Sequence, residues 1–453
     1  MGTLVAFLIG LAVMFFLMLK TKVGPFMSML FGSLVIGLAC GVSSGDTISA
    51  IAGGFGNTCK SIGIVIIFGT ILGEYLEKSN ATQKIATTLL RLTGDKNADV
   101  ALAATGFVVS IPVFCDVALI MLAPIAKAVA KKSRLKLGAL ATVLALGLLI
   151  TNTYVAPTPA PLSIASILGI DVGQSILWGL AASLFVVVVV WAYCRFFLQK
   201  KPDDWYVRSD SAAALEDSEN GNGEEAELSN AAPAVMPSFL ASILPILVPI
   251  VLILFNTTCS MLLPEGAALL TVSSFLGDKN IALALGIVTA ILLLKKCIPQ
   301  NEVYDAMTNA LSTAGPVIFI TAAGGALSKI IDATGVGVLF ADSLAASALP
   351  VIIIPFLICG FSKFVQGSSS VAVIMASTLT LPLCNAGLIH PIVAFIAICA
   401  GSGFGSHVNN SFFWVFANLF GYDTKTTLKS LCVGQHVMAF AGLAAACVIS
   451  LIL

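Results

Sequence analysis

Apolar stretches of helix length, separated by short polar segments, follow one another along almost the whole chain. A helix needs roughly 20 apolar residues to cross a bilayer. We therefore expect an all-α polytopic membrane protein. The pattern predicts full spans at about 2–19, 24–42, 61–76, 137–170, 174–198, 238–262, 279–294, 314–331, 390–421 and 430–453.

Polar breaks interrupt four apolar stretches. Two breaks lie inside the predicted spans 137–170 and 390–421, and two lie inside the additional apolar pieces 99–130 and 350–386. We predict that each additional piece enters and leaves the membrane on the same side, as a re-entrant hairpin. Unsatisfied backbone is costly in hydrocarbon, so breaks persist only where protein or water contacts them. The breaks are therefore the candidate functional positions.

The two halves of the chain resemble each other. The sequence VALIM at Val117–Met121 returns as VAVIM at Val371–Met375, an offset of 254 residues (371 − 117), and three other short matches keep nearly this offset in the same order. This regularity predicts an internal repeat. A polar, acidic segment between the halves has the composition of a solvated linker. The predicted parts are a first membrane repeat at 1–198, a linker at 199–237 and a second repeat at 238–453.

Charged residues are scarce, at 10% of the chain against 58% apolar residues, whereas soluble domains carry about 25% charged residues. The net charge of zero argues against nucleic acid as a partner. With the N-terminus outside, 19 of the 23 Lys and Arg residues fall in predicted cytoplasmic segments, as the positive-inside rule requires.

The same topology makes the two repeats inverted. Five spans precede the linker, so the second half begins inside. We expect a multi-pass bacterial inner-membrane protein with both termini in the periplasm. The first hairpin then opens to the cytoplasm and the second to the outside. Inverted repeats place a substrate site at their interface, near the membrane midplane.

The first break, Ile111–Asp116, contains Pro112, which stops the first arm of its hairpin. Asp116 is the one acidic residue that we place well inside the membrane. An ionisable residue there is by default a functional candidate, for a coupling ion or for the substrate. The alternative is that Asp116 caps the second arm of the hairpin, because Asp is a good N-cap.

The matching break in the second hairpin runs from Lys363 to Ser370. Lys363 is a candidate for holding an anionic substrate; alternatively, its charge extends to the membrane surface. Small residues let the backbone approach a ligand, and hydroxyls and amides offer adaptable hydrogen bonds. The serines, alternatively, only cap the second arm. The candidate substrate-binding residues here are Lys363, Gln366, Gly367, Ser368, Ser369 and Ser370.

Three prolines at alternate positions break the span 137–170, and Gly, Ser and Asn break the span 390–421. Carbonyls and amides at such unwound stretches suit a small polar ligand, although the proline break could also be a loop at the membrane surface. His407 is a candidate relay for a coupling proton, as is Asp116, or a hydrogen-bonded structural histidine. The candidate substrate-binding residues are Asn152, Thr158, Asn409, Asn410 and Ser411.

These breaks carry a resemblance to a known family. The motifs are GSHVNNSFFW at Gly405–Trp414, QGSSSVA at Gln366–Ala372 and the proline-rich stretch Ala156–Pro161. Through them the chain resembles the gluconate permease (GntP) family of bacterial gluconate:proton symporters, part of a wider ion transporter superfamily, over all but the linker. The resemblance implies proton-coupled uptake of sugar acids, or of D-serine in some members. It also implies a homodimer in which paired hairpins move against a fixed scaffold.

We therefore expect secondary active symport of a small organic acid, such as gluconate, another sugar or hydroxy acid, or a D-serine-like molecule, with a proton. A sodium-coupled carboxylate transporter or an ion exchanger of the same fold is the alternative. An enzyme is not expected, because the sequence has no His-Glu-x-x-His motif and no paired Asp motif for diphosphate substrates. We expect no metal and no cofactor. The expected partners are the organic anion, the coupling ion and membrane lipid.

Overall fold

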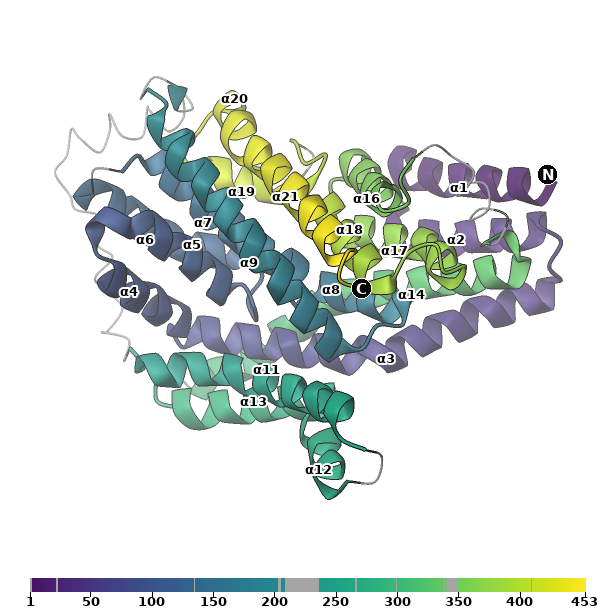
Figure 1. Ribbon diagram of the computed structural model, residues 1–453, viewed down its shortest axis with the longest axis horizontal. Coiled ribbons are helices and arrows are strands. Elements are labelled where there is room, and N and C mark those ends of the chain that lie inside the picture. Colours follow the sequence, from purple (N-terminus) through teal and green to yellow (C-terminus); the bar gives the residue numbers. More distant parts are fainter. Residues whose placement is uncertain are drawn as a thin grey trace.

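The computed structural model describes residues 2–21, 23–133, 135–202, 205–207, 236–264, 267–298, 300–337, 339, 349–408 and 410–453. The secondary-structure elements in these ranges are all helices. Figure 1 shows them in an elongated bundle, with the N-terminus at one end of the long axis and the C-terminus near its middle. The all-α prediction is confirmed, whereas most of the predicted linker lies outside the described residues.

The helices of the first half differ widely in length. They are α1 (Gly2–Lys20), α2 (Gly24–Ala39), α3 (Ser44–Lys78), α4 (Ala81–Thr93), α5 (Ala98–Val109), α6 (Cys115–Lys132), α7 (Leu137–Tyr154), α8 (Pro159–Leu168) and α9 (Val172–Phe196), with short 3₁₀ turns at Asp95–Asn97 and Leu198–Lys200.

The helices of the second half follow a similar order. They are α11 (Phe239–Leu262), α12 (Ala268–Leu276), α13 (Lys279–Leu294), α14 (Gln300–Thr334), α16 (Ile353–Gln366), α17 (Ser369–Asn385), α18 (Pro391–Gly403), α19 (Ser411–Phe420), α20 (Thr424–Thr427) and α21 (Val433–Ile449), with a π-helical turn at Leu428–Cys432 before α21.

Each predicted span coincides with a helix, but the lengths differ. Six described helices are long and apolar enough to cross a membrane, or seven if the bent pair α12 and α13 forms one span. The predicted spans 61–76 and 314–331 are too short, because α3 and α14 each contain 35 residues. Their first turns carry polar residues that lower the local hydropathy, yet the helices continue there because they pack against each other.

The long helices α3 and α14 approach each other closely where glycines face one another. A Cβ atom on Gly54 of α3 would lie 2.4 Å from the backbone oxygen of Gly325 in α14. No side chain fits at that distance, so glycine is required at this crossing. Small residues permit this backbone-to-backbone contact between helices in membrane proteins.

Corresponding helices of the two halves make corresponding contacts. The helix α2 packs on α14, and α13 packs on α3. Likewise, α7 packs on the hairpin α5–α6 and on α9, while α18 packs on the hairpin α16–α17 and on α21. These contacts bring residues of the four breaks together around one cavity.

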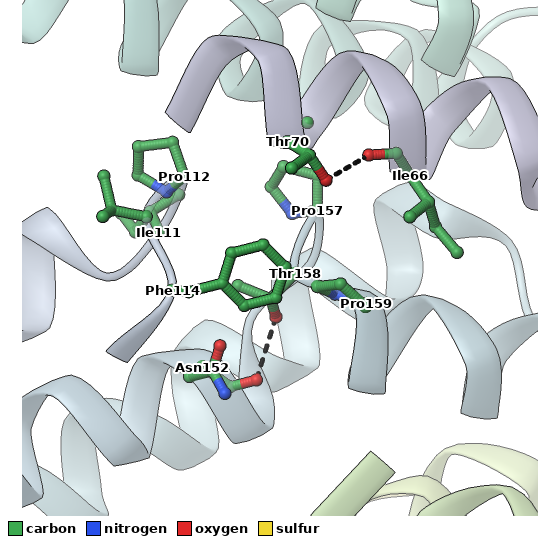
Figure 2. A pocket seen from close by; sticks show the side chains of 11 residues that line it. Ile66, Thr70, Ile111, Pro112, Phe114, Asn152, Pro157, Thr158 and Pro159 are labelled. Atoms are coloured by element: carbon green, nitrogen blue, oxygen red, sulfur yellow. Dashed lines mark hydrogen bonds between the residues drawn. The ribbon is translucent and has the colours of Figure 1, made fainter. Parts of the chain in front are cut away.

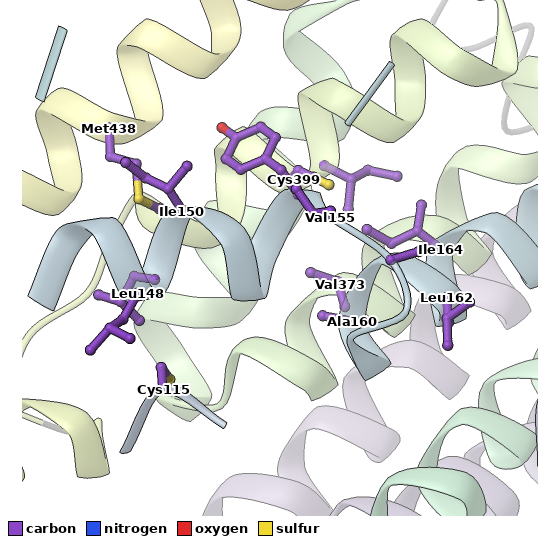
Figure 3. Close-up of a cluster of buried hydrophobic side chains, with 14 of the residues drawn as sticks. Cys115, Leu148, Ile150, Val155, Ala160, Leu162, Ile164, Val373, Cys399 and Met438 are labelled. Carbon is purple, nitrogen blue, oxygen red and sulfur yellow. The ribbon is translucent and has the colours of Figure 1, made fainter. Parts of the chain in front are cut away.

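The centre of the core is formed by the first parts of the two broken helices. In α7 all residues except Leu137 and Asn152 are buried, and in α18 all except Pro391 are buried. Figure 3 shows part of this core, where apolar side chains of α6, α7, α8, α17, α18 and α21 meet. The packed core holds the ends of the broken helices in place around the site described next.

Candidate functional site

A cavity of about 340 Å³ lies where the four helix breaks meet. We call it the central cavity. Both hairpins and both broken helices contribute to it, so the structure brings together the four breaks that the sequence singled out. Its lining residues are Phe114, Cys115, Asp116, Leu149, Asn152, Thr153, Pro159, Ala160, Gly367, Ser368, Ser369, Ser370, Ser402, Asn410, Ser411 and Phe412.

Four helices begin at this cavity. First-turn residues of α6, α8, α17 and α19 are all part of its lining. The first N–H groups of a helix lack partners within the helix, and the helix dipole places partial positive charge there. The convergence of four such ends favours a negatively charged group in the cavity.

Asp116 lies in the first turn of α6 and lines the cavity. The N-cap of α6 is Phe114, and no side chain caps this helix. The alternative interpretation of Asp116 as the N-cap is therefore wrong. The carboxylate oxygen Oδ2 lies 3.8 Å from the Cys115 Sγ, whereas Oδ1 is buried and has no hydrogen-bond partner among the described residues. This oxygen is available to a ligand or a proton.

Asn152 and Thr158 lie on either side of the proline break, and only Asn152 lines the central cavity. The Asn152 Oδ1 is buried without a hydrogen-bond partner among the described residues. The Thr158 hydroxyl instead donates to the backbone oxygens of Asn152, at 3.0 Å, and Val155, at 2.7 Å. Thr158 therefore stabilises the break and does not line the central cavity; Figure 2 shows its hydrogen bond to the Asn152 backbone oxygen.

The tip of the second hairpin contributes three serines and a glycine to the cavity. Ser368 is the N-cap of α17 and accepts from the Val371 N–H at 3.5 Å. Ser369 and Ser370 follow in the first turn, and Gly367 ends α16 with a φ of 80°, a conformation that other residues adopt at a cost. The alternative that the serines only cap the second arm is therefore correct for Ser368 as a cap, but Ser368 also lines the cavity.

Lys363 lies behind this tip. Its side chain is buried, with 1% exposure, and its Nζ donates to the Gly367 backbone oxygen and to the Ser369 Oγ, both at 2.7 Å. Lys363 does not line the cavity. Its side chain does not extend toward the surface either, so the interpretation that its charge reaches the membrane surface is wrong. Its ammonium contacts Ser369, which lines the same cavity as Asp116.

The break between α18 and α19 places Asn410 and Ser411 at the cavity. The Asn410 Oδ1 caps α19 by accepting from the Phe412 N–H at 3.2 Å. His407 does not line the cavity; its Nε2 lies 2.9 Å from the Phe364 backbone oxygen, which ties the break to the second hairpin. Asn409 and the side chain of Gln366 lie outside the described residues.

Several lining residues are absent from the sequence-based candidates. Thr153 and Ser402 lie within the predicted breaks, so counting every polar residue of each break as a candidate would have included them. Leu149 and Phe412 are apolar, and nothing in their residue type distinguishes them from core residues. Only the folded arrangement identifies them as part of the cavity wall.

Almost no space remains between α3 and the two breaks of the first half. A second cavity of about 10 Å³, room for about one water, separates α3 from the two breaks of the first half. In Figure 2 the tip residues Pro112 and Phe114 lie opposite Pro157 and Thr158, with Thr70 of α3 beside them. The first hairpin and the proline break are thus packed directly on α3.

Comparisons with known proteins agree with this architecture. The family model for GntP family permeases matches residues 2–452. An uncharacterized permease of Haemophilus influenzae is 34% identical over 426 residues, which cover 93% of this chain and 86% of that protein. The high-affinity gluconate transporter of Escherichia coli is 27% identical, covering 99% of this chain and 100% of its own length.

Among solved structures, the YdaH transporter of Alcanivorax borkumensis has a similar fold. The TM-score is 0.68 at 13% sequence identity, and the match covers 94% of this chain and 98% of that chain. All these similarities extend through both halves of the chain.

Proposed function

This chain belongs to the GntP family of permeases, so it is a membrane transporter and not an enzyme, and we propose that it takes up a sugar acid by symport with protons. The substrate class covers gluconate, related hydroxy acids and, less closely, D-serine-like molecules. The membrane is proposed to be the bacterial inner membrane.

The convergence of four helix N-termini on one cavity carries this proposal. An anionic group such as a carboxylate is stabilised at such helix ends. A volume of about 340 Å³ falls within the range of small-molecule sites. Relatives include a gluconate transporter, and gluconate combines one carboxylate with several hydroxyls.

The polar side chains around the cavity suit those hydroxyls. The unpartnered Asn152 Oδ1 can accept a hydrogen bond from a substrate hydroxyl. Ser370, Ser411 and Asn410 add donors and acceptors at the opposite wall. An apolar ligand would leave these polar groups without hydrogen-bond partners, which is costly. The site is therefore selective for a polyhydroxy acid.

The charges near the cavity supply a reason for proton coupling. With Asp116 and Lys363 both ionised, their charges sum to zero. A proton on Asp116 leaves one uncompensated positive charge, which matches a monocarboxylate. Anion and proton then favour each other's binding, and this reciprocal linkage is what symport requires.

Sodium is the alternative coupling ion, because Asp116 Oδ1 and Asn152 Oδ1 are two oxygens at the same cavity that lack hydrogen-bond partners in the part of the chain that the structure describes. Oxygen ligands suit a hard cation as well as a proton. The two ions differ in the gradient that drives uptake, so the choice can be tested directly.

The transport architecture is part of the proposal. The matched order and contacts of the helices support two inverted-topology repeats, each with a re-entrant hairpin and an interrupted transmembrane helix. In this arrangement the hairpins and broken helices move against α3 and α14, both termini are periplasmic, and the protein is a homodimer.

The test is uptake of radiolabelled gluconate by the purified protein in proteoliposomes. An imposed pH gradient should drive accumulation, and a sodium gradient at equal pH should not. The Asn152→Leu variant should lose uptake, while Asn309→Leu, which changes an exposed asparagine of α14 that does not line the cavity, should retain it. Failure of both gradients to concentrate gluconate would refute the proposal, and accumulation with sodium alone would replace the proton by sodium.

A further inference from the structure

A second polar cavity lies outside the central site. Its volume is about 220 Å³, and it is enclosed by α3, α8, α14 and the C-terminal part of α17. Seven of its eleven lining residues are polar or charged. Polar side chains are costly against lipid, so this concentration between transmembrane helices indicates a space for a polar ligand. We call it the Lys329 cavity.

The charges of this cavity are an exposed ion pair. The Lys329 Nζ lies 3.5 Å from the Asp332 Oδ2, and the two side chains are 54% and 43% exposed. Such exposed pairs contribute little to stability, so a ligand can replace the contact. Lys329 is also one of only four basic residues, with Lys60, Lys279 and Lys363, outside the segments predicted to be cytoplasmic.

The lining residues fit a ligand that carries both a carboxylate and hydroxyls. A carboxylate can pair with Lys329, and hydroxyl groups can donate to the Asp332 carboxylate. Asn57 and Ser61 of α3 and Ser166 of α8 surround this pair with further hydrogen-bonding groups. A simple fatty acid would leave Asp332 and these groups unpaired.

The Lys329 cavity is in line with the central cavity along α8. Pro159 and Ala160 at the start of α8 line the central cavity, and Ser166, six residues further, lines the Lys329 cavity. At 1.5 Å per residue this separates the two cavities by roughly 10 Å. The helix α17 likewise runs from Ser370 at one cavity to Leu381 at the other.

Polar contacts to α14 occupy the layer between the cavities. The Ser163 Oγ of α8 lies 2.9 Å from the Thr321 Oγ1, and the Thr378 Oγ1 of α17 donates to the Gly324 backbone oxygen at 3.4 Å. These hydroxyls can exchange their partners for those of a passing polyhydroxy molecule, which an apolar seal cannot do.

From this geometry we propose that the Lys329 cavity is a second binding site for the transported polyhydroxy carboxylate, occupied before the anion reaches the central cavity. The inference rests on the proposed function, because it takes its ligand class from it. In the predicted topology the Lys329 cavity lies on the outer side of the central cavity, so the anion enters through it during uptake.

Equilibrium dialysis with radiolabelled gluconate tests the proposal on the purified full chain. The wild type should bind two molecules per chain at saturation, and Lys329→Gln should bind one of the two with roughly two- to five-fold lower affinity. Asn152→Leu should bind one molecule, because it affects the central cavity. The matched control is Lys60→Gln, which removes the same charge from α3 beside Ser61 but lies outside the cavity lining; it should bind two.

Transport kinetics give the second measurement. Lys329→Gln should raise the KM for gluconate uptake by roughly two- to five-fold, the range expected for one solvent-exposed charge, with the maximal rate retained. A wild type that binds one gluconate per chain, or a Lys329→Gln variant that matches Lys60→Gln in both measurements, would overturn the second site and leave the proposed function standing. A wild type that binds none would overturn both.

Discussion

Replacing Asp116 by asparagine removes the only carboxylate among the described residues that line the central cavity. Asparagine keeps nearly the same shape but carries no charge and holds no transferable proton. Because Asp116 does not cap α6, the substitution should leave the hairpin intact. The variant therefore imitates a permanently protonated site and isolates the coupling step.

The size of the effect follows from the single carboxylate. One proton per substrate links the accumulation ratio to the pH gradient, so one pH unit, about 1.4 kcal/mol, corresponds to tenfold accumulation. The wild type should reach about this ratio in proteoliposomes, and Asp116→Asn should reach only equal concentrations on both sides. A proton and a monocarboxylate together carry no net charge, so an imposed membrane potential should not change the wild-type ratio. Asp116→Asn moves the anion alone, so equal concentrations are expected for it only at zero potential, and its ratio should follow an imposed potential.

The substrate affinity has a definite dependence on pH. Protonation of Asp116 removes the negative charge that repels the anion, so the affinity of the wild type for gluconate should rise as the pH falls. Asp116→Asn should bind with an affinity independent of pH and should still exchange labelled for unlabelled gluconate. Tenfold accumulation by Asp116→Asn under the same gradient would remove Asp116 from the coupling mechanism.

Three further predictions follow from the same contacts. Lys363→Ala should lower the melting temperature and the affinity for gluconate, because a buried charge-assisted hydrogen bond contributes about 1.5–3 kcal/mol; Lys363→Arg, which keeps the charge, should lower both less. Gly73→Ala should reduce uptake strongly, because its Cβ would lie 2.2 Å from the Pro112 backbone oxygen, an overpacking that costs about 1–3 kcal/mol. Gly69→Ala should be tolerated, because its nearest contact would be an ordinary 3.5 Å. A cysteine placed in the linker 199–237 should react with impermeant reagents only from the cytoplasmic side.

Each of these predictions has an outcome that contradicts it. Unchanged affinity and melting temperature in Lys363→Ala would mean that its hydrogen bonds do not hold the hairpin tip. Equal uptake by the two alanine variants of α3 would mean that the tip is not packed on this helix during transport. Labelling of the linker from outside intact cells would exclude the inverted-repeat topology.

The positions of the breaks could be predicted from the sequence, because prolines, glycines and an acid within apolar runs are visible without a structure. The convergence of these breaks could also be expected from the repeat. The direction of individual side chains could not. Lys363 was the natural candidate for a carboxylate contact, yet its Nζ bonds to its own hairpin tip, since the tip turns back over it.

Helix lengths were predicted less well than helix positions. From hydropathy alone, the span that corresponds to α3 was predicted to begin at residue 61, although the helix begins at Ser44. The polar first turns are stabilised by packing on α14, a contact distant in the sequence. The amphipathic α4 was missed because its charged face makes it too polar for a span, while its buried face, with Ile85 and Ala86, packs on neighbouring helices.

The four helix ends at the central cavity have an evolutionary consequence. Their positive potential comes from peptide groups, and the peptide group is the same whichever side chain it bears. No single substitution can therefore abolish the attraction for a carboxylate. Side chains such as Asn152, Ser370 and Asn410 remain free to vary between lineages, so one inherited scaffold can acquire new sugar acids by changing only the pattern of hydroxyl recognition.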